Sequence, residues 1–182
     1  MNLLDATLSS LETYSDQDED GFDLSQAWSE VTVHAHRGGR HPDNSMSGIK
    51  KMMADGIEGV EIDVYLTKDD VPILFHGGDY GEVQKEVPEI GAVASTKIRA
   101  LTIEQIKAIE IAPSECPPMV EEVIKESKGQ LFFNFEIKDP DPKVVPIMLD
   151  LVDKYSLWNN CMMSSYNHAH LDSFEQLSAG RI

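Results

Sequence analysis

The 182-residue sequence is poor in cysteine, in positive charge and in long apolar runs. Its two cysteines, Cys116 and Cys161, lie far apart, so neither a disulfide framework nor a zinc knuckle is indicated. No stretch approaches the roughly 20 consecutive apolar residues that a membrane-spanning helix requires. Residues Met1–Ser10 lack the basic start and apolar core of a secretory signal. We therefore expect a cytoplasmic protein without integral membrane contact.

The shortage of positive charge excludes some partners. Fifteen Lys and Arg residues face 32 Asp and Glu residues, which gives a formal net charge of −17. A chain this acidic repels nucleic-acid phosphates and anionic membrane surfaces, so nucleic-acid binding is not expected. Chemistry on a phosphate would need a local cationic centre, either a metal ion or clustered Arg and Lys. The apolar fraction of 41% suffices for a packed core.

The first 30 residues differ in composition from the rest and predict an acidic, helical N-terminal preface. Within it, Asp16, Asp18, Asp20 and Gly21 match the first half of a calcium-binding loop. Ala27 stands at the twelfth position, where a bidentate Glu would complete such a loop. Two interpretations of this acidic loop stay open, a calcium site and a solvated acidic turn, and we favour the turn.

From residue 31 onward, short apolar strands alternate with helical stretches, which is typical of an α/β protein with a mainly parallel sheet. The predicted strands are Val31–His36, Gly59–Leu66, Val71–His76, Leu131–Ile137 and Cys161–Ser165. The predicted helices are Asn44–Ala54, Ile103–Ile111, a segment from Pro117 or Pro118 to Lys128, Val144–Lys154, and His168–Leu177. Pro146 fits the fourth helix only in its first turn.

One connection does not fit this scheme. Only Thr67–Asp70 separates the second strand from the third, whereas a parallel crossover needs a dozen or more residues. Either the second strand ends near Asp63 and the chain then doubles back in an excursion, or the two strands are antiparallel. We favour the excursion.

Each predicted strand finishes in residues with useful chemistry. The endings are His36 with Arg37, Glu61 with Asp63, His76, Glu136 with Lys138, and Ser164 with Ser165. Ligands of parallel α/β folds bind at the carboxyl ends of the strands, so we expect these endings to meet at one rim.

The carboxylates at this rim predict a metal site. Alternation along a strand places Glu61 and Asp63 on the same face, and Glu136 ends another strand. Three carboxylates on an inward face repel one another unless a hard divalent cation lies between them. We expect Glu61, Asp63 and Glu136 to hold Mg²⁺ or Ca²⁺.

The remaining polar residues of the rim complete a candidate phosphodiesterase site. His36 and His76 suit general acid and base chemistry, because imidazole titrates near neutral pH. Arg37 and Lys138 supply the positive charge that a phosphate diester needs.

The same residues carry a family resemblance. The segments are His36-Arg37-Gly38, Pro42-Asp43-Asn44-Ser45, Gly59-Val60-Glu61-Ile62-Asp63-Val64, Thr67-Lys68-Asp69, Pro72, His76, Leu101-Thr102, Asn134-Phe135-Glu136-Ile137-Lys138 and Ser164-Ser165-Tyr166. In order and spacing they closely resemble the signature of the glycerophosphodiester phosphodiesterase family. The resemblance covers about residues 31–177. It departs from the family after His76, where Gly77 and Gly78 precede Asp79, and at Asp43, where the family usually has Glu.

The resemblance implies a (β/α)₈ TIM-type barrel and a metal-dependent hydrolase that cleaves glycerophosphodiesters to glycerol 3-phosphate and an alcohol. It assigns His36 and His76 to catalysis, Glu61, Asp63 and Glu136 to Mg²⁺ or Ca²⁺, and Arg37, Lys138 and Asn44 to the phosphate or substrate. About five of eight βα units are present, so we expect residues 31–182 to form a C-terminally incomplete barrel domain whose open edge favours self-association. The alternatives are a lysophospholipid or sphingolipid head-group phosphodiesterase and a non-catalytic barrel remnant that binds partners.

Overall fold

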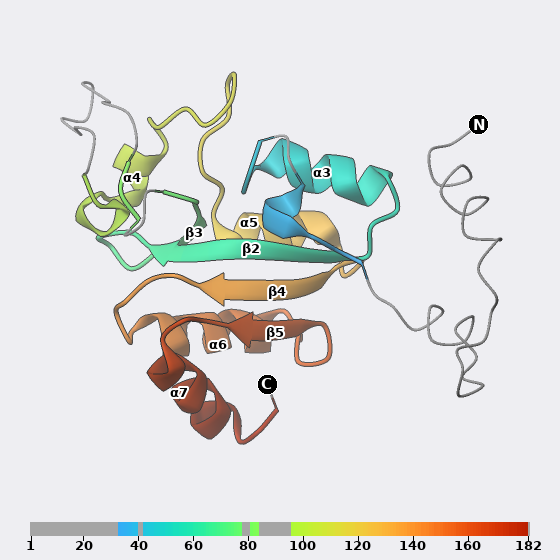
Figure 1. The fold of residues 1–182 in the computed structure, drawn as a ribbon, viewed down its shortest axis with the longest axis vertical. Coiled ribbons are helices and arrows are strands. Elements are labelled where there is room, and N and C mark those ends of the chain that lie inside the picture. Colours follow the sequence, from blue (N-terminus) through green and yellow to red (C-terminus); the bar gives the residue numbers. More distant parts are fainter. Residues whose placement is uncertain (1–32, 40–41, 78–80, 84–95, 182) are drawn as a thin grey trace, which may run out of the picture. The chain divides into compact units, whose positions relative to one another are not determined.

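The computed structural model describes residues 33–39, 42–77, 81–83 and 96–181 (Figure 1). All of them belong to one compact unit, Val33–Ile182. The acidic preface predicted over residues 1–30 and the calcium-loop motif Asp16–Gly21 lie outside the described residues, and both stay predictions. Within the described part, no helix has the length and apolar character needed to cross a membrane.

The described residues build one five-stranded sheet. Its strands are β1 (His34–Ala35), β2 (Gly59–Leu66), β3 (Pro72–Leu74), β4 (Phe132–Ile137) and β5 (Cys161–Ser164). Strands β1, β2, β4 and β5 lie side by side in that order and are parallel. This arrangement confirms the predicted α/β class. It also places the carboxyl ends of these strands at one edge, as the sequence indicated.

The connection between β2 and β3 is a hairpin, so our preference for a doubling-back excursion from Asp63 was wrong. Strand β2 continues to Leu66, and β3 pairs with it antiparallel through Val64↔Leu74 and Leu66↔Pro72. The turn closes because Asp70 adopts a left-handed φ of 62° and the Thr67 N–H donates to the Val71 carbonyl at 3.0 Å. A hairpin needs only a few residues of connection, which removes the difficulty of the short segment.

Five helices and two 3₁₀ turns accompany the sheet in the described part. The helices are α3 (Met46–Ala54), α4 (Ile103–Ile106), α5 (Val120–Ser127), α6 (Val144–Lys154) and α7 (His168–Ser178), and the turns are η1 (His36–Gly38) and η3 (Ile98–Ala100). Helix α6 matches its predicted bounds, with Pro146 in the first turn as required. Helix α3 begins at Met46 instead of Asn44, because Ser45 caps it and accepts the Gly48 N–H.

Two other helices begin or end differently from the prediction. The capping box of Thr102 and Gln105 is present, but α4 ends at Ile106 instead of Ile111. The following N–H groups bond to carbonyls three residues back, as in a tighter 3₁₀ turn. Helix α5 begins at Val120 instead of Pro117 or Pro118, because the Pro118 carbonyl accepts the Leu74 N–H at 2.9 Å and keeps that segment extended beside β3.

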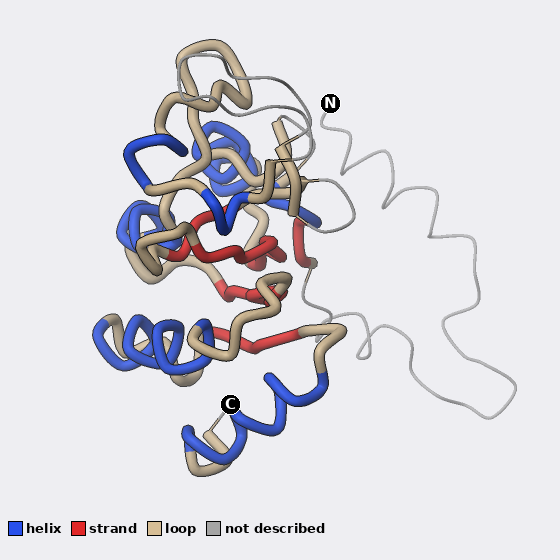
Figure 2. The backbone as a smooth tube through the Cα atoms, turned by 90° about the vertical axis from the view of Figure 1, so that its left-hand side faces the viewer, coloured by secondary structure: helices blue, strands red, loops and turns tan. Residues whose placement is uncertain are grey.

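The sheet has one apolar face and one polar face. Alternating residues of β2 and β4 are fully buried in a single core with α3, α5 and α6. In Figure 1, α5 and α6 lie behind the sheet, and in Figure 2 some helices lie to the left of the strands while others lie above and below them. The buried alternate residues are Val60, Ile62, Val64, Phe133, Phe135 and Ile137. Burial of each such side chain contributes about 1.5–3 kcal/mol. Because these residues must face the core, the residues that alternate with them, including Glu61, Asp63 and Glu136, lie on the other face of the sheet.

At the amino-terminal ends of the strands, aromatic side chains cover the polar face. There the His34 ring packs on Phe132, with ring centroids 5.3 Å apart. A Cβ at Gly59 would lie 2.3 Å from the His34 ring, so only glycine fits at the start of β2. The polar residues of this face therefore lie nearer the carboxyl ends.

A charge network holds three segments together beyond those carboxyl ends. The Arg99 guanidinium donates to the Thr67 carbonyl and to Asp141, both at 2.6 Å, and pairs with Asp70 at 2.8 Å. Lys143 donates to the other Asp70 oxygen at 3.2 Å. Partly exposed ion pairs contribute little to stability. The network therefore matters for placement, since it anchors η3 beside the β2–β3 turn and the β4–α6 loop.

Candidate functional site

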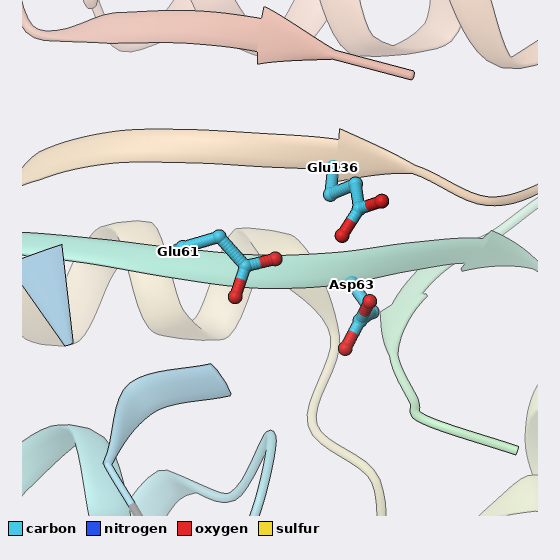
Figure 3. A group of neighbouring side chains, drawn as sticks. All are labelled: Glu61, Asp63 and Glu136. Carbon is cyan, nitrogen blue, oxygen red and sulfur yellow. The ribbon is translucent and has the colours of Figure 1, made fainter. Parts of the chain in front are cut away.

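Three carboxylates converge where the middle of β2 lies beside the carboxyl end of β4 (Figure 3). The parallel register pairs Asp63 with Glu136, and Glu61 lies two residues earlier on the same face of β2. One oxygen of each carboxylate lies within 4.8 Å of the others. The sheet register therefore brings together the three residues predicted as metal ligands.

The donor set fits a hard divalent cation. Glu61 Oε1 is buried and has no hydrogen-bond partner in the described part of the chain. Burial, and then the charges of Asp63 and Glu136, raise the pKa of Glu61 to about 7 against the opposing effect of the Arg37 N–H. A cation bound among the three groups would satisfy the orphaned oxygen and offset the repulsion.

Lys138 lies on the β4 side of the cluster. Its ammonium donates to Glu136 and lies 3.6 Å from Asp63 Oδ1. Burial alone would lower the pKa of Lys138, but the Glu136 hydrogen bond and the surrounding negative charges raise it overall. Lys138 therefore keeps a positive charge beside the carboxylates, where a phosphate could also contact it.

His36 and Arg37 lie on the opposite side of the cluster, in η1. We predicted His36 as the end of a strand, but the chain turns after Ala35, because Arg37 takes a left-handed φ of 55° and Gly38 follows with 73°. This turn directs the Arg37 N–H to Glu61 Oε2 at 2.9 Å. The exposed His36 ring lies 3.8 Å from the same oxygen.

The Arg37 guanidinium contacts two carboxylates, but one of its hydrogen-bond donors has no acceptor among the described residues. It donates to Asp43 at 3.1 Å, and its Nε lies 3.7 Å from Asp63 Oδ2. That Nε is buried without an acceptor among the described residues. Arg37 therefore keeps donor capacity at the edge of the cluster, where an anion would satisfy it.

His76 lies just beyond β3 and is exposed. The preceding residue, Phe75, donates its N–H to the Asp63 carbonyl at 3.1 Å, which holds this segment beside Asp63. With Asn44, His76 lines a cavity of about 180 Å³. The structure thus brings both predicted catalytic histidines to the rim, where His36 lies near Glu61 and His76 lines a separate small cavity. Residues 78 and 79, where the sequence departs from the pattern of the family it resembles, lie outside the described part.

Asn44 is committed to Asp63. Its amide donates to Asp63 Oδ2 at 2.8 Å and accepts the Asp63 N–H at 3.0 Å, and the side chain is 1% exposed. Asn44 also has a left-handed φ of 52°, which asparagine tolerates better than most residues. The contact of Asn44 with the phosphate or substrate stays a prediction. Its two hydrogen bonds show that it orients Asp63.

Replacing Asn44 by alanine should lower the free energy of unfolding by about 2 to 3 kcal/mol, because two buried polar groups of Asp63 lose their partners. Alanine is also strained at positive φ. Chemical denaturation of the two proteins measures the difference. Asn159→Ala, at an exposed position, is the control and should change stability little. A loss no larger than that of the control would contradict this role of Asn44.

Two tyrosines of the rim were not among the predicted site residues. Tyr65 shares the alternation parity of Glu61 and Asp63, so the sequence placed it on the polar face of β2. Tyr166 lies two residues after the end of β5, and the centroid of its ring lies 5.1 Å from Lys138 Nζ. The sequence offered one signal for each tyrosine, the strand alternation for Tyr65 and the position after a strand for Tyr166. Neither tyrosine belongs to the residue types first considered for acid–base or metal chemistry.

The chain is similar in sequence to known proteins. Residues 36–177 match the model of the glycerophosphoryl diester phosphodiesterase family. Glycerophosphodiester phosphodiesterase 1 from Mus musculus is 27% identical over 149 residues, which are 75% of this chain and 43% of the mouse protein. The chain thus spans less than half the length of this curated relative.

Solved structures show the same fold. A protein from Galdieria sulphuraria superposes with a TM-score of 0.73 at 23% identity, over 83% of this chain and 63% of that one. A phosphodiesterase from Oleispira antarctica, solved in complex with the product sn-glycerol-3-phosphate, gives a TM-score of 0.69 at 22% identity, over 83% of this chain and 64% of that one. These likenesses confirm the predicted α/β barrel class for the described residues.

Proposed function

Because the chain belongs to the glycerophosphoryl diester phosphodiesterase family, we propose that it takes part in the metal-dependent hydrolysis of glycerophosphodiesters to glycerol 3-phosphate and an alcohol. The observation that carries the proposal is the cluster of Glu61, Asp63 and Glu136, whose oxygens lie within 4.8 Å of one another between Arg37 and Lys138. Negative ligands flanked by cations suit a metal ion together with an anionic substrate.

In this proposal the three carboxylates hold Mg²⁺ or Ca²⁺, which when bound supplies Lewis-acid activation of the phosphate. Arg37 and Lys138 bind the phosphate oxygens, because each is a cation beside the cluster with donors to offer. Of His36 and His76, one accepts the proton of the attacking water, or attacks the phosphorus to form a P–N bond that water then cleaves. The other donates a proton to the departing alcohol oxygen. Asn44 keeps Asp63 in position.

The proposal extends to partners and location. Its substrate is a small molecule, and we place the reaction in the cytoplasm. Among the described residues, β1 and β5 each pair with a single strand of the main sheet, so each has one outer edge with unpaired backbone groups. Such edges favour association, and we propose that copies of the chain pair through them. A sedimentation experiment that finds only monomers would contradict this pairing.

The reaction is tested with the purified chain, glycerophosphocholine and either Mg²⁺ or Ca²⁺. We expect release of glycerol 3-phosphate that stops when a chelator is added and resumes when metal is restored. Circular dichroism first establishes that the protein is folded. Release that is insensitive to the chelator would contradict metal dependence, and no release from folded, metal-supplied protein would contradict the activity of this chain.

A further inference from the structure

Ser164 is a strand ending with useful chemistry that the proposed reaction does not use. It is the last residue of β5, and its hydroxyl donates to Asn134 Oδ1 at 2.7 Å. The parallel register places Ser164 directly beside Glu136 of β4. The hydrogen-bonded pair of Ser164 and Asn134 therefore lies next to one of the proposed metal ligands.

Asn134 is flanked by two of the three carboxylates. The register pairs it with Glu61 of β2, and Glu136 follows two residues later on the same face of β4. Neighbouring strands lie about 4.8 Å apart, so the Asn134 and Glu61 side chains leave the sheet from adjacent points. The Asn134 side chain is partly exposed on this face. Its amide therefore borders the place proposed for the cation and the phosphate.

The Ser164 hydroxyl decides which way this amide faces. Strand β4 lies between β5 and β2 in the sheet. Because the amide oxygen is bonded to a hydroxyl of β5, the NH₂ group on the other side of the planar amide is turned away from β5, toward the strand of Glu61. The terminal torsion of asparagine has two roughly equal settings. The hydroxyl therefore favours the setting that presents donors to the cluster.

The NH₂ group of Asn134 is available to a ligand. No described residue accepts a hydrogen bond from it. Glu61 Oε2 accepts the Arg37 N–H, and Glu61 Oε1 has no partner in the described part of the chain. An amide offers two donors without a charge. It can therefore bind a phosphate oxygen without competing with a cation for the carboxylates, whereas Lys138 already donates to Glu136.

On these grounds, and resting on the proposed function, we propose that Asn134 is a further substrate-binding residue whose NH₂ group donates to a phosphate oxygen of the glycerophosphodiester. Ser164 is the positioning residue that keeps this NH₂ group turned toward the cluster. Glycerol 3-phosphate carries phosphate oxygens too, so the same contact holds the product. The cation depends on neither residue.

The test is calorimetric binding of glycerol 3-phosphate in the presence of Mg²⁺. Asn134→Ala should weaken binding about tenfold, as expected for the loss of a hydrogen bond to a charged group. Ser164→Ala should weaken it about threefold, because the amide then visits other rotamers. Ser164→Thr keeps the hydroxyl and should restore the affinity. Ser173→Ala, which removes a hydroxyl bonded within α7, is the control and should leave the affinity unchanged.

Two further measurements separate this role from a structural one. Asn134→Ala should keep the gain in melting temperature that Mg²⁺ gives to the wild-type chain, because the three carboxylates remain. In the Asn134→Ala background, Ser164→Ala should have no additional effect on binding, because the group that it positions is gone. An effect of Ser164→Ala that persists in that background would contradict the positioning role.

Three results would overturn the contact with Asn134. They are unchanged binding of glycerol 3-phosphate by Asn134→Ala, loss of the Mg²⁺-dependent gain in stability in that variant, which would mean that Asn134 acts on the metal ligands, and no binding by the folded wild-type chain with Mg²⁺. Hydrolysis assays on the same proteins test the proposed function separately. A wild-type chain that binds glycerol 3-phosphate through Asn134 but hydrolyses no diester would contradict the activity and still support the contact.

Discussion

In protein carrying Glu61→Gln, Mg²⁺ and Ca²⁺ should no longer raise the melting temperature, and hydrolysis of glycerophosphodiesters should fall by about 10²–10³-fold, the several kcal/mol that a Lewis acid supplies. The same substitution should make the metal-free protein more stable. Both effects have one cause, the crowding of Glu61, Asp63 and Glu136 within 4.8 Å. Without a cation, the buried carboxyl of Glu61 is in an unfavourable place, as its pKa of about 7 indicates. A neutral amide removes that repulsion and, with it, a ligand.

The opposite directions of the two effects make this prediction specific. A substitution that merely damaged the fold would lower both the activity and the metal-free stability. Thermal unfolding with a chelator, and again with saturating metal, measures both quantities. A ligand at 100 times its Kd stabilises the folded state by about 2.7 kcal/mol, which a melting curve resolves. The wild-type chain should show this gain and Glu61→Gln should not.

Glu126→Gln serves as the matched control, because Glu126 is a half-exposed carboxylate on α5 that pairs with Lys50 far from the cluster. It should retain both the metal-dependent gain in stability and the hydrolytic activity. An unaltered metal response in Glu61→Gln would show that the cation binds elsewhere, and the proposed ligand set would then be wrong.

The sequence predicted the metal cluster because strand alternation needs no tertiary information. Glu61 and Asp63 are two residues apart in an apolar strand, so their side chains share a face whatever the partner strand is. What alternation could not supply was the register. The pairing of Asp63 with Glu136 depends on how β4 docks against β2, which the buried parity of both strands decides.

The β2–β3 hairpin and the turn at His36 show what local patterns miss. Both depend on left-handed residues that are not glycine, Asp70 with a φ of 62° and Arg37 with a φ of 55°. Such conformations cost energy locally and are repaid by contacts made elsewhere, as when the Arg37 N–H reaches Glu61. No spacing rule announces them, so the first strand was predicted too long and the hairpin was not preferred.

The contacts of Asn44 also depend on the fold. The resemblance assigns this residue to the phosphate or substrate, and that role stays a prediction. Only the fold shows that both ends of the amide are engaged by Asp63, 19 residues away. The sequence alone therefore did not reveal that Asn44 positions one of the predicted metal ligands.

Alanine at His36 or at His76 should each reduce hydrolysis of glycerophosphodiesters by about 10²–10⁴-fold, the range over which a positioned acid or base accelerates a reaction. Both side chains are exposed at the rim, so their removal should leave the melting temperature nearly unchanged. Steady-state kinetics on the folded variants measures the loss. His168→Ala, an exposed histidine at the start of α7, is the control and should retain full activity.

A change of leaving group assigns the two roles. Nitrophenol leaves as a stable anion and needs no proton, whereas an alkyl alcohol must be protonated as it departs. The variant that lacks the general acid should therefore hydrolyse a nitrophenyl ester of glycerol 3-phosphate at nearly the wild-type rate, while the other variant stays slow on both esters. Recovery in His36→Ala would identify His36 as the acid, and recovery in His76→Ala would identify His76. Full activity in both alanine variants would remove the histidines from the reaction.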